Sequence, residues 1–124
     1  MSIFLDPRAP AKKEIEGITF HIRVFDSVQR TSFMAHMGPL QQMFEEHAEG
    51  DEVGLTDDLI DHLSTILKMG IMGWEGKDAP RPRFDKKTGY LKPKSLGVLD
   101  FSVWFQLLAA ITETNTLSEE DAGN

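Results

Sequence analysis

The sequence predicts a single domain spanning residues 1–124, of the α+β class and mainly α-helical. Residues 18–25 alternate between apolar and polar side chains, which indicates a half-buried strand. Two later stretches carry apolar residues three and four positions apart, the spacing of amphipathic helices. We therefore expect one or more short N-terminal strands followed by about four helices. A long irregular loop, residues 75–99, should precede the last main helix.

The N-terminal part contains the expected strand. Residues 1–16 begin with Ile3-Phe4-Leu5 and then become polar, so we expect an ordered hook followed by a flexible lead. The side chains on the inward face of the strand are Ile18, Phe20, Ile22 and Val24. One strand is not stable alone, and three partners remain open: the segment around Ile3, the pair Tyr90-Leu91, or a second copy of the chain.

Two helices are expected between residues 28 and 48. Asp26-Ser27 is an N-cap signal for the first. Gly38-Pro39 should end it, because the residue before a proline avoids the helical conformation and proline suits a first helical turn. The second helix would then cover residues 39–48.

Thr56-Asp57-Asp58 is the clearest helix start, with a capping hydroxyl followed by carboxylates in the first turn. The apolar stripe behind it comprises Leu59, Ile60, Leu63, Ile66, Leu67 and Ile71. Three glycines, Gly70, Gly73 and Gly76, should end this helix and allow close packing around Trp74, which we assign to the core.

The C-terminal part contains the last expected helix, residues 101–115, which Asp100 caps. Its apolar side chains cover more than half of its circumference, so it either lies centrally or presents an apolar face to a partner. Residues 118–121 resemble a capping box, with Asp121 in the place where Glu or Gln is usual, which suggests a frayed final turn. We expect residues 116–124 to form a flexible end.

Composition excludes several classes of function. The chain has no cysteine, so disulfides and thiolate metal sites are absent. No apolar run reaches the roughly 20 residues that a membrane span needs. The net charge is −7, yet residues 75–94 carry seven Lys/Arg against three acidic residues, so the rest carries −11. That acidic surface repels nucleic acid, and we expect neither a nucleic-acid nor a membrane partner. The basic loop is interpreted as solvated, with an acidic partner as the alternative.

No catalytic, cofactor or metal site is expected. The four histidines, His21, His36, His47 and His62, do not have the spacing of a metal site. Asp57, Asp58 and Asp61 are explained as helix-cap charges rather than as an acid/base pair. Glycines at intervals of three differ from the dinucleotide-binding fingerprint. We therefore expect that the protein is not an enzyme.

Interaction features are more abundant. Methionine offers adaptable apolar surface, and tryptophan is large and rigid enough to anchor an interface. The alternative is that these side chains fill an ordinary core. The candidate partner-binding residues are Met34, Met37, Met43, Met72, Trp74, Phe101, Trp104, Phe105 and Leu108.

Four short motifs occur in a characteristic order: the opening MSIFLDP, the pair Gly73-Trp74 closing a helix, a Lys-Thr-Gly turn ending at Gly89, and the polar close from Asn115 to Asn124. Together they resemble the tail assembly chaperones of long-tailed bacteriophages and prophages. The sequence departs from that family at Gly123-Asn124, where a basic ending is common.

The resemblance implies a role in tail morphogenesis. A member of this family binds and solubilises the tape-measure protein, helps recruit tail-tube protein, self-associates as a homo-oligomer and acts in the host cytoplasm. Many members also exist in a longer form made by ribosomal frameshifting. The alternative hypothesis is a small structural virion protein, such as a tail connector or tail-completion component.

Overall fold

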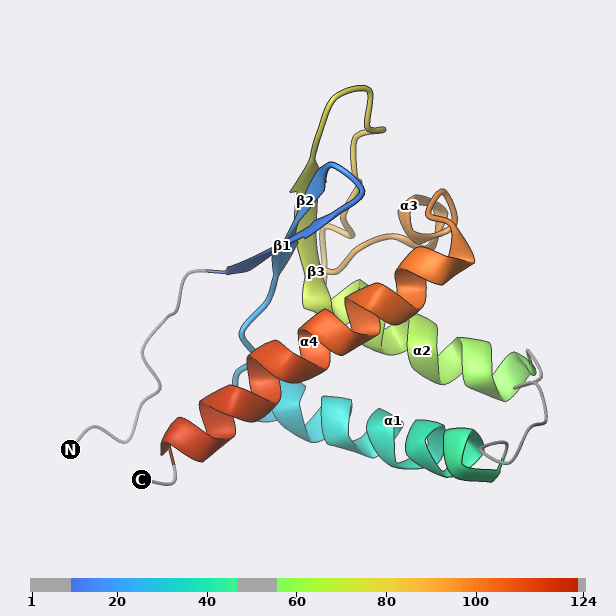
Figure 1. Ribbon diagram of the computed structural model, residues 1–124, viewed down its shortest axis with the longest axis vertical. Coiled ribbons are helices and arrows are strands. Elements are labelled where there is room, and N and C mark those ends of the chain that lie inside the picture. Colours follow the sequence, from blue (N-terminus) through green and yellow to red (C-terminus); the bar gives the residue numbers. More distant parts are fainter. Residues whose placement is uncertain (1–9, 47–55, 123–124) are drawn as a thin grey trace.

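The chain folds into a small antiparallel sheet with helices packed against it (Figure 1). This computed structural model describes residues 10–46 and 56–122, and the side chains of residues 10–45 and 56–116. The elements are β1 (Ala11–Ile15), β2 (Ile18–Ile22), α1 (Ser27–Glu46), α2 (Asp57–Gly70), β3 (Ile71–Glu75), α3 (Pro93–Leu96) and α4 (Phe101–Ala122). The α+β, mainly helical class is therefore confirmed.

The sheet has the order β1-β2-β3, with both pairings antiparallel. The predicted strand is β2, although it ends at Ile22. Its partners are β1 and β3 and not Tyr90-Leu91, where Leu91 instead forms an isolated bridge with Phe84. The alternative partner around Ile3 and the N-terminal hook lie outside the described residues.

β1 corrects the prediction that residues 1–16 end in a flexible lead. Its middle residues, Lys12-Lys13-Glu14, are exposed and show no apolar alternation, so the side-chain pattern did not reveal the strand. Ile15 is buried and β1 pairs with β2 over its whole length. A tight turn with positive φ at Glu16 and Gly17 joins the two strands. Backbone pairing with β2 thus makes this segment a strand, although its side-chain pattern does not predict one.

β3 follows α2 without a loop and was predicted only as a helix end. Phe20 pairs with Trp74 and Ile22 with Ile71, and a register shift between them leaves Met72 as an extra residue. Such a bulge lets two non-alternating positions, Ile71 and Trp74, both face the core. The indole N–H of Trp74 donates to the carbonyl oxygen of Pro80 at 2.7 Å. The assignment of Trp74 to the core is confirmed.

α1 is one helix, so the prediction of a break at Gly38-Pro39 is wrong. The proline ring meets both the backbone N–H and the Cβ of the residue before it, and Gly38 has no Cβ, so part of the clash is absent here. The cap is stronger than expected, since the Gln29 N–H donates to Asp26 Oδ1 at 2.7 Å and the Asp26 N–H donates to Gln29 Oε1 at 3.0 Å.

α2 begins where the sequence predicted. The Leu59 N–H donates to the hydroxyl oxygen of Thr56 at 3.2 Å, and most of the predicted stripe is buried. The helix ends at Gly70, which packs directly on α4. A Cβ at Gly70 would lie 2.5 Å from Cδ1 and 2.8 Å from Cγ1 of Ile111. The glycine therefore permits a close approach of the two helices.

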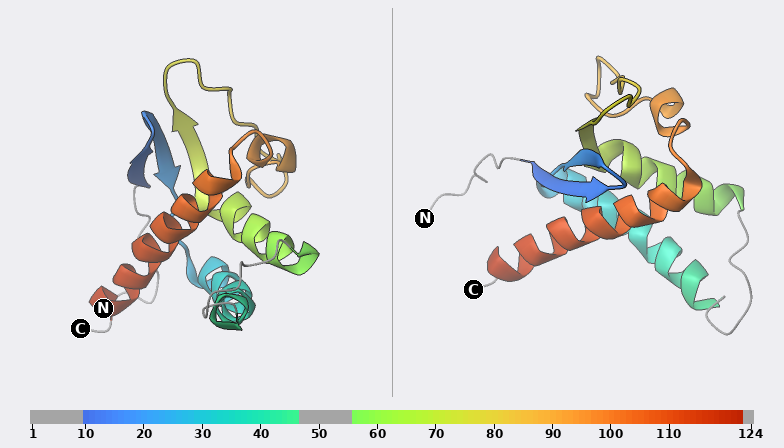
Figure 2. Two further views of the ribbon diagram at one scale, coloured as in Figure 1. Left: turned by 45° about the vertical axis from the view of Figure 1, so that its right-hand side comes forward. Right: turned by 45° about the horizontal axis from the view of Figure 1, so that its top comes forward.

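α4 crosses α2 and the strands β1 and β2, as both views of Figure 2 show. Asp100 caps it as predicted, accepting from the Ser102 N–H at 2.9 Å. The helix continues to Ala122, which corrects the expectation of a flexible end at residues 116–124. Residues 123–124 lie outside the described residues.

Asn115 joins the sheet to this helix. Its side chain is buried, with 2% of its surface exposed, and its Oδ1 accepts from the Phe25 N–H at 2.7 Å. Its Nδ2 donates to the carbonyl oxygens of Arg23 at 3.2 Å and Ile111 at 2.9 Å. One amide thus satisfies the backbone where the chain leaves β2 and enters α1.

We expect Asn115→Ala to lower the free energy of unfolding by about 2–4 kcal/mol, because it leaves the Phe25 N–H and the Arg23 carbonyl buried without a partner. The neighbouring Thr116 is exposed, and Thr116→Ala should change stability by less than about 0.5 kcal/mol. Urea titration measures both variants. If both variants change the free energy of unfolding equally and by a small amount, the Asn115 hydrogen bonds do not stabilise the segment between β2 and α1.

We expect Gly70→Ala to destabilise the protein by about 1–3 kcal/mol through overpacking against Ile111. Ile111→Val removes Cδ1, the nearest atom, so the double variant should lose less than the sum of the two single losses. A double-mutant cycle from chemical denaturation measures this coupling. Strict additivity would contradict the close contact.

Candidate functional site

An open groove of about 500 Å³ lies along the seam between α1 and α4. Met37 lines it from α1, and the rest of the lining comes from α4. The α4 residues are Phe105, Leu108, Ala109, Thr112, Glu113 and Thr116. In Figure 1 the two helices are closest where α1 begins and diverge along its length.

The α4 residues in the groove are three or four positions apart, so they form one stripe on the helix. Val103, Leu107 and Ile111 form another stripe, which is buried in the core. α4 therefore has one stripe buried in the core and a second stripe along the groove, which is apolar at Phe105, Leu108 and Ala109 and polar from Thr112 to Thr116. This arrangement explains why its apolar residues cover more than half of the circumference.

Aromatic side chains close one end of the groove. Phe105 is 36% exposed, and its ring lies 6.2 Å from that of Phe44 on α1 and 5.2 Å from that of Phe101. Phe101 in turn contacts Trp104 with ring centroids 4.9 Å apart. The rings of Phe44 and Phe105 separate the end of α1 from the start of α4, and Phe105 stays partly accessible from solvent.

A second hollow, of about 400 Å³, lies at the start of α1. It is lined by Ser27, Arg30, Thr31 and Met34, and Met34 is 58% exposed. Arg30 also reaches α4, where its Nη2 donates to the carbonyl oxygen of Asn115. Since Asn115 and Thr116 are neighbours on α4, this hollow and the groove follow the same seam. We call the two together the α1/α4 groove.

The structure distributes the predicted partner-binding residues over three environments. Met34 and Phe105 are exposed along the α1/α4 groove, with Phe101 half-buried behind Phe105. Met37 and Leu108 also line the groove but belong to the buried core. Trp74 and Trp104 lie in the core, where the Trp104 indole N–H donates to the Leu96 carbonyl oxygen. Met43 packs half-buried against the core, and Met72 is exposed on β3, away from the groove residues.

Sequence reasoning missed Arg30 and the polar side of the α4 stripe. Thr112, Glu113 and Thr116 continue the three-and-four spacing that begins at Phe105, and this was the signal available. Which of the two stripes faces outward depends on how α4 crosses α2. The spacing alone does not contain that information.

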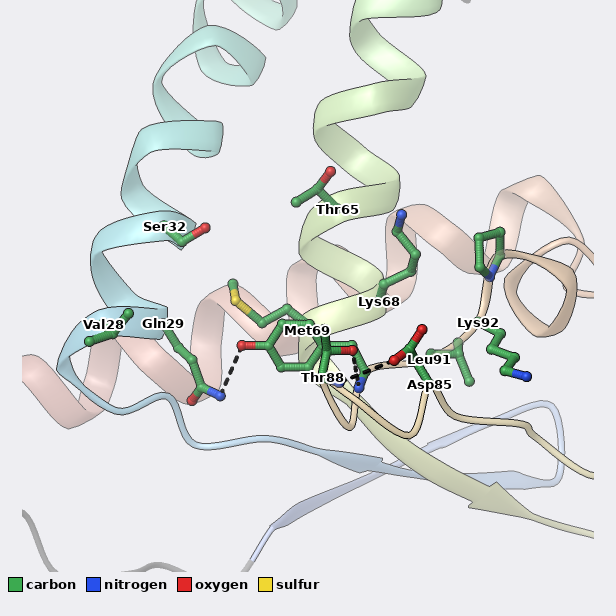
Figure 3. A pocket seen from close by; sticks show the side chains of 12 residues that line it. Val28, Gln29, Ser32, Thr65, Lys68, Met69, Asp85, Thr88, Leu91 and Lys92 are labelled. Atoms are coloured by element: carbon green, nitrogen blue, oxygen red, sulfur yellow. Dashed lines mark hydrogen bonds between the residues drawn. The ribbon is translucent and has the colours of Figure 1, made fainter.

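A separate pocket of about 410 Å³ opens between α1, α2 and the basic loop (Figure 3). Met69 and Leu91 give it an apolar floor, and Lys68 and Lys92 lie at its edge. The loop is held to α1 by a hydrogen bond of 3.3 Å from Gln29 Nε2 to the Tyr90 hydroxyl.

The one carboxylate of this pocket serves the loop turn. The N–H groups of Lys87 and Thr88 donate to Asp85 Oδ1 at 2.7 and 3.1 Å. These bonds hold the pKa of Asp85 below its ordinary value. The basic loop is attached to the body of the protein through Tyr90 and through the Leu91 N–H, which donates to the Lys68 carbonyl oxygen at 3.0 Å. Lys92 of the loop and Lys68 of α2 thus flank a mainly apolar cavity.

Two histidines meet between α1 and α2. His36 Nδ1 lies 2.9 Å from His62 Nδ1, so one ring nitrogen donates while the other accepts. Burial lowers the pKa of His36, the neighbouring His62 lowers it further, and the carboxylate of Asp61 acts in the opposite direction. Protonating both facing nitrogens would replace the hydrogen bond by repulsion between two cations.

We expect acid to weaken the packing of α1 on α2. A pKa lowered by folding means that the unfolded chain binds more protons, so stability falls as the pH drops below the ordinary value of 6.5. Between about pH 7 and about pH 5.5 the wild type should lose more stability than His36→Gln. Denaturant titrations at each pH measure this; parallel curves for the two proteins would contradict the expectation.

Neither metal-binding nor membrane-spanning features are seen in the part of the chain that the structure describes. In residues 10–46 and 56–122, no three His, Asp or Glu side chains converge as metal ligands would. None of the helices over these residues is both long and apolar enough to cross a bilayer. Comparison of the chain with protein-family models, with curated proteins and with solved structures gives no match.

Proposed function

We propose that this protein is a tail assembly chaperone of a long-tailed phage, which binds the tape-measure protein through the α1/α4 groove. The observation that supports the binding role is the groove along α4, whose apolar part around Phe105 is left accessible where α1 diverges. The identity of the partner comes from the sequence motifs that resemble this family. No reaction is part of the proposal.

The groove has the chemistry that an amphipathic helix requires. An apolar helix face docks into an apolar groove through a few anchors at helical spacing. Met34 is exposed, flexible and polarizable, so it adapts to partner side chains of different shape, and Met37 lies below it at the edge of the core. Phe105 supplies a rigid ring at the other end. A chaperone for a long helical protein needs this tolerance, because it meets many similar segments.

The charge distribution suits the same role. Outside residues 75–94 the chain carries −11, which keeps a protein with an exposed apolar groove in solution. We place its action in the host cytoplasm, where tail parts assemble. Recruitment of tail-tube protein and self-association complete the proposed role. The basic loop, with a balance of +4, is a surface that could meet an acidic partner during that step.

Co-expression with the tape-measure protein of the same phage tests the proposal. We expect the wild type to keep that protein soluble, and Phe105→Glu to lose most of this effect because it places a charge in the groove. Met72→Glu is the matched control, since Met72 is 39% exposed and Phe105 36%, but Met72 lies on β3. Thermal melts establish that both variants fold.

Two outcomes would contradict the proposal. An insoluble tape-measure protein in the presence of wild-type chain removes the chaperone role. Recovery of the chain in purified phage particles by mass spectrometry would favour the alternative, a small structural virion protein.

A further inference from the structure

Arg30 stands out in the α1/α4 groove because its hydrogen-bonding capacity is largely unused. A guanidinium carries five N–H donors. The Nη2 of Arg30 makes one long hydrogen bond, 3.5 Å, to the Asn115 carbonyl oxygen. Its Nε is buried and has no partner. Buried donors without acceptors are rare in folded proteins, so this one calls for an explanation.

No carboxylate compensates the charge of Arg30 in the described structure. Over residues 10–45 and 56–116, the salt-bridge contact is between His21 Nε2 and Glu75 Oε1, 3.5 Å apart on β2 and β3 and an ion pair only when His21 is protonated. The remaining neighbours of Arg30 in its hollow are Ser27, Thr31 and Met34, which carry no charge. A permanently charged group thus faces a hollow of about 400 Å³ without a counter-ion.

The position of Arg30 gives the groove a direction. Arg30 lies in the first turns of α1, and Phe44, which closes the aromatic end, lies fourteen residues later on the same helix. Fourteen residues of α-helix span about 21 Å, or about four turns. The groove therefore has a cation at one end and aromatic rings at the other, with Met34, Met37 and the carboxylate of Glu113 between them.

We propose that Arg30 binds a carboxylate of the docked segment and so fixes its direction. The occupant is an amphipathic helix with an apolar stripe and an Asp or Glu at one end of it, about four turns from the residues that meet Phe105. A carboxylate matches the planar guanidinium and can accept two of its N–H groups. This inference rests on the proposed function and names the chemical class of segment that the chaperone selects.

Overlapping 20-residue peptides of the tape-measure protein are the probe. The first readout is fluorescence anisotropy of labelled peptides with the wild-type chain. For each bound peptide with a carboxylate beside its apolar stripe, a second peptide carries Glu→Gln or Asp→Asn at that position. We expect wild type to bind the amide peptide about tenfold more weakly, the usual scale of a charged hydrogen-bonded pair.

Arg30→Gln completes a double-mutant cycle. It should bind the carboxylate peptide about tenfold more weakly than wild type and should no longer distinguish the two peptides. Arg30→Lys, which keeps the charge but not the planar fork, should lie between the two. A thermal melt of each variant separates loss of pairing from loss of folding, and binding of a peptide without a carboxylate should be unchanged.

Each other outcome has a definite meaning. If wild type binds peptides and Arg30→Gln discriminates between carboxylate and amide as wild type does, this inference is wrong while the proposed function stands. If wild type binds no peptide, the proposed function fails and the inference with it. If light scattering shows a dimer that Phe105→Glu dissociates, the groove is occupied by a second copy and the inference is overturned.

Discussion

The structure depends on how the chain passes from the sheet to the helices at residues 23–25. This segment has left β2 and has not yet entered α1, so its backbone groups need partners from elsewhere. The side chain of Asn115 on α4 accepts from the Phe25 N–H and donates to the Arg23 carbonyl oxygen. Arg23 is also bound to the end of α2: its backbone N–H donates to the Gly70 carbonyl oxygen and its Nε to the Met69 carbonyl oxygen, both at 2.8 Å.

This junction sets the positions of three helices relative to the sheet. α4 is fixed through Asn115, α2 through its last two carbonyls, and α1 begins directly after the segment that both of them hold. The close approach at Gly70 adds a second constraint, because it presses α2 against Ile111 one turn before Asn115. Buried polar bonds of this kind are costly to leave unmade, so they specify one arrangement over others.

The groove is a consequence of that arrangement. α1 and α4 are close at Arg30 and Asn115 and are separated by aromatic rings at Phe44 and Phe105. α4 therefore buries one apolar stripe against α2 and the sheet and leaves Phe105 partly exposed in the groove. Under the proposed function, the cation at one end gives this groove a direction as well as a shape, which suits a helical partner.

Local signals predicted the elements that depend on neighbouring residues. The alternation at residues 18–22, the cap at Thr56 and the cap at Asp100 were each read correctly, because periodicity and capping act within a few residues. The predictions failed at β1, at Gly38-Pro39, at β3 and at the end of α4. β1 is ordered by backbone pairing rather than indicated by its side chains, and Gly38 lacks the Cβ that would meet the ring of Pro39. The bulge at Met72 removes the regular alternation by which β3 would be recognised.

For the candidate site, the sequence by itself determined which side chains are present. They are methionines, phenylalanines and an α4 segment with more apolar surface than one core contact can bury. It did not determine which side of α4 faces outward, nor that Trp104 would be buried while Phe105 next to it is accessible. Nor did it show that Arg30 would lack a carboxylate. Those features are decided by the tertiary structure, because they depend on crossing angles and on contacts between residues far apart in the chain, such as Phe25 and Asn115.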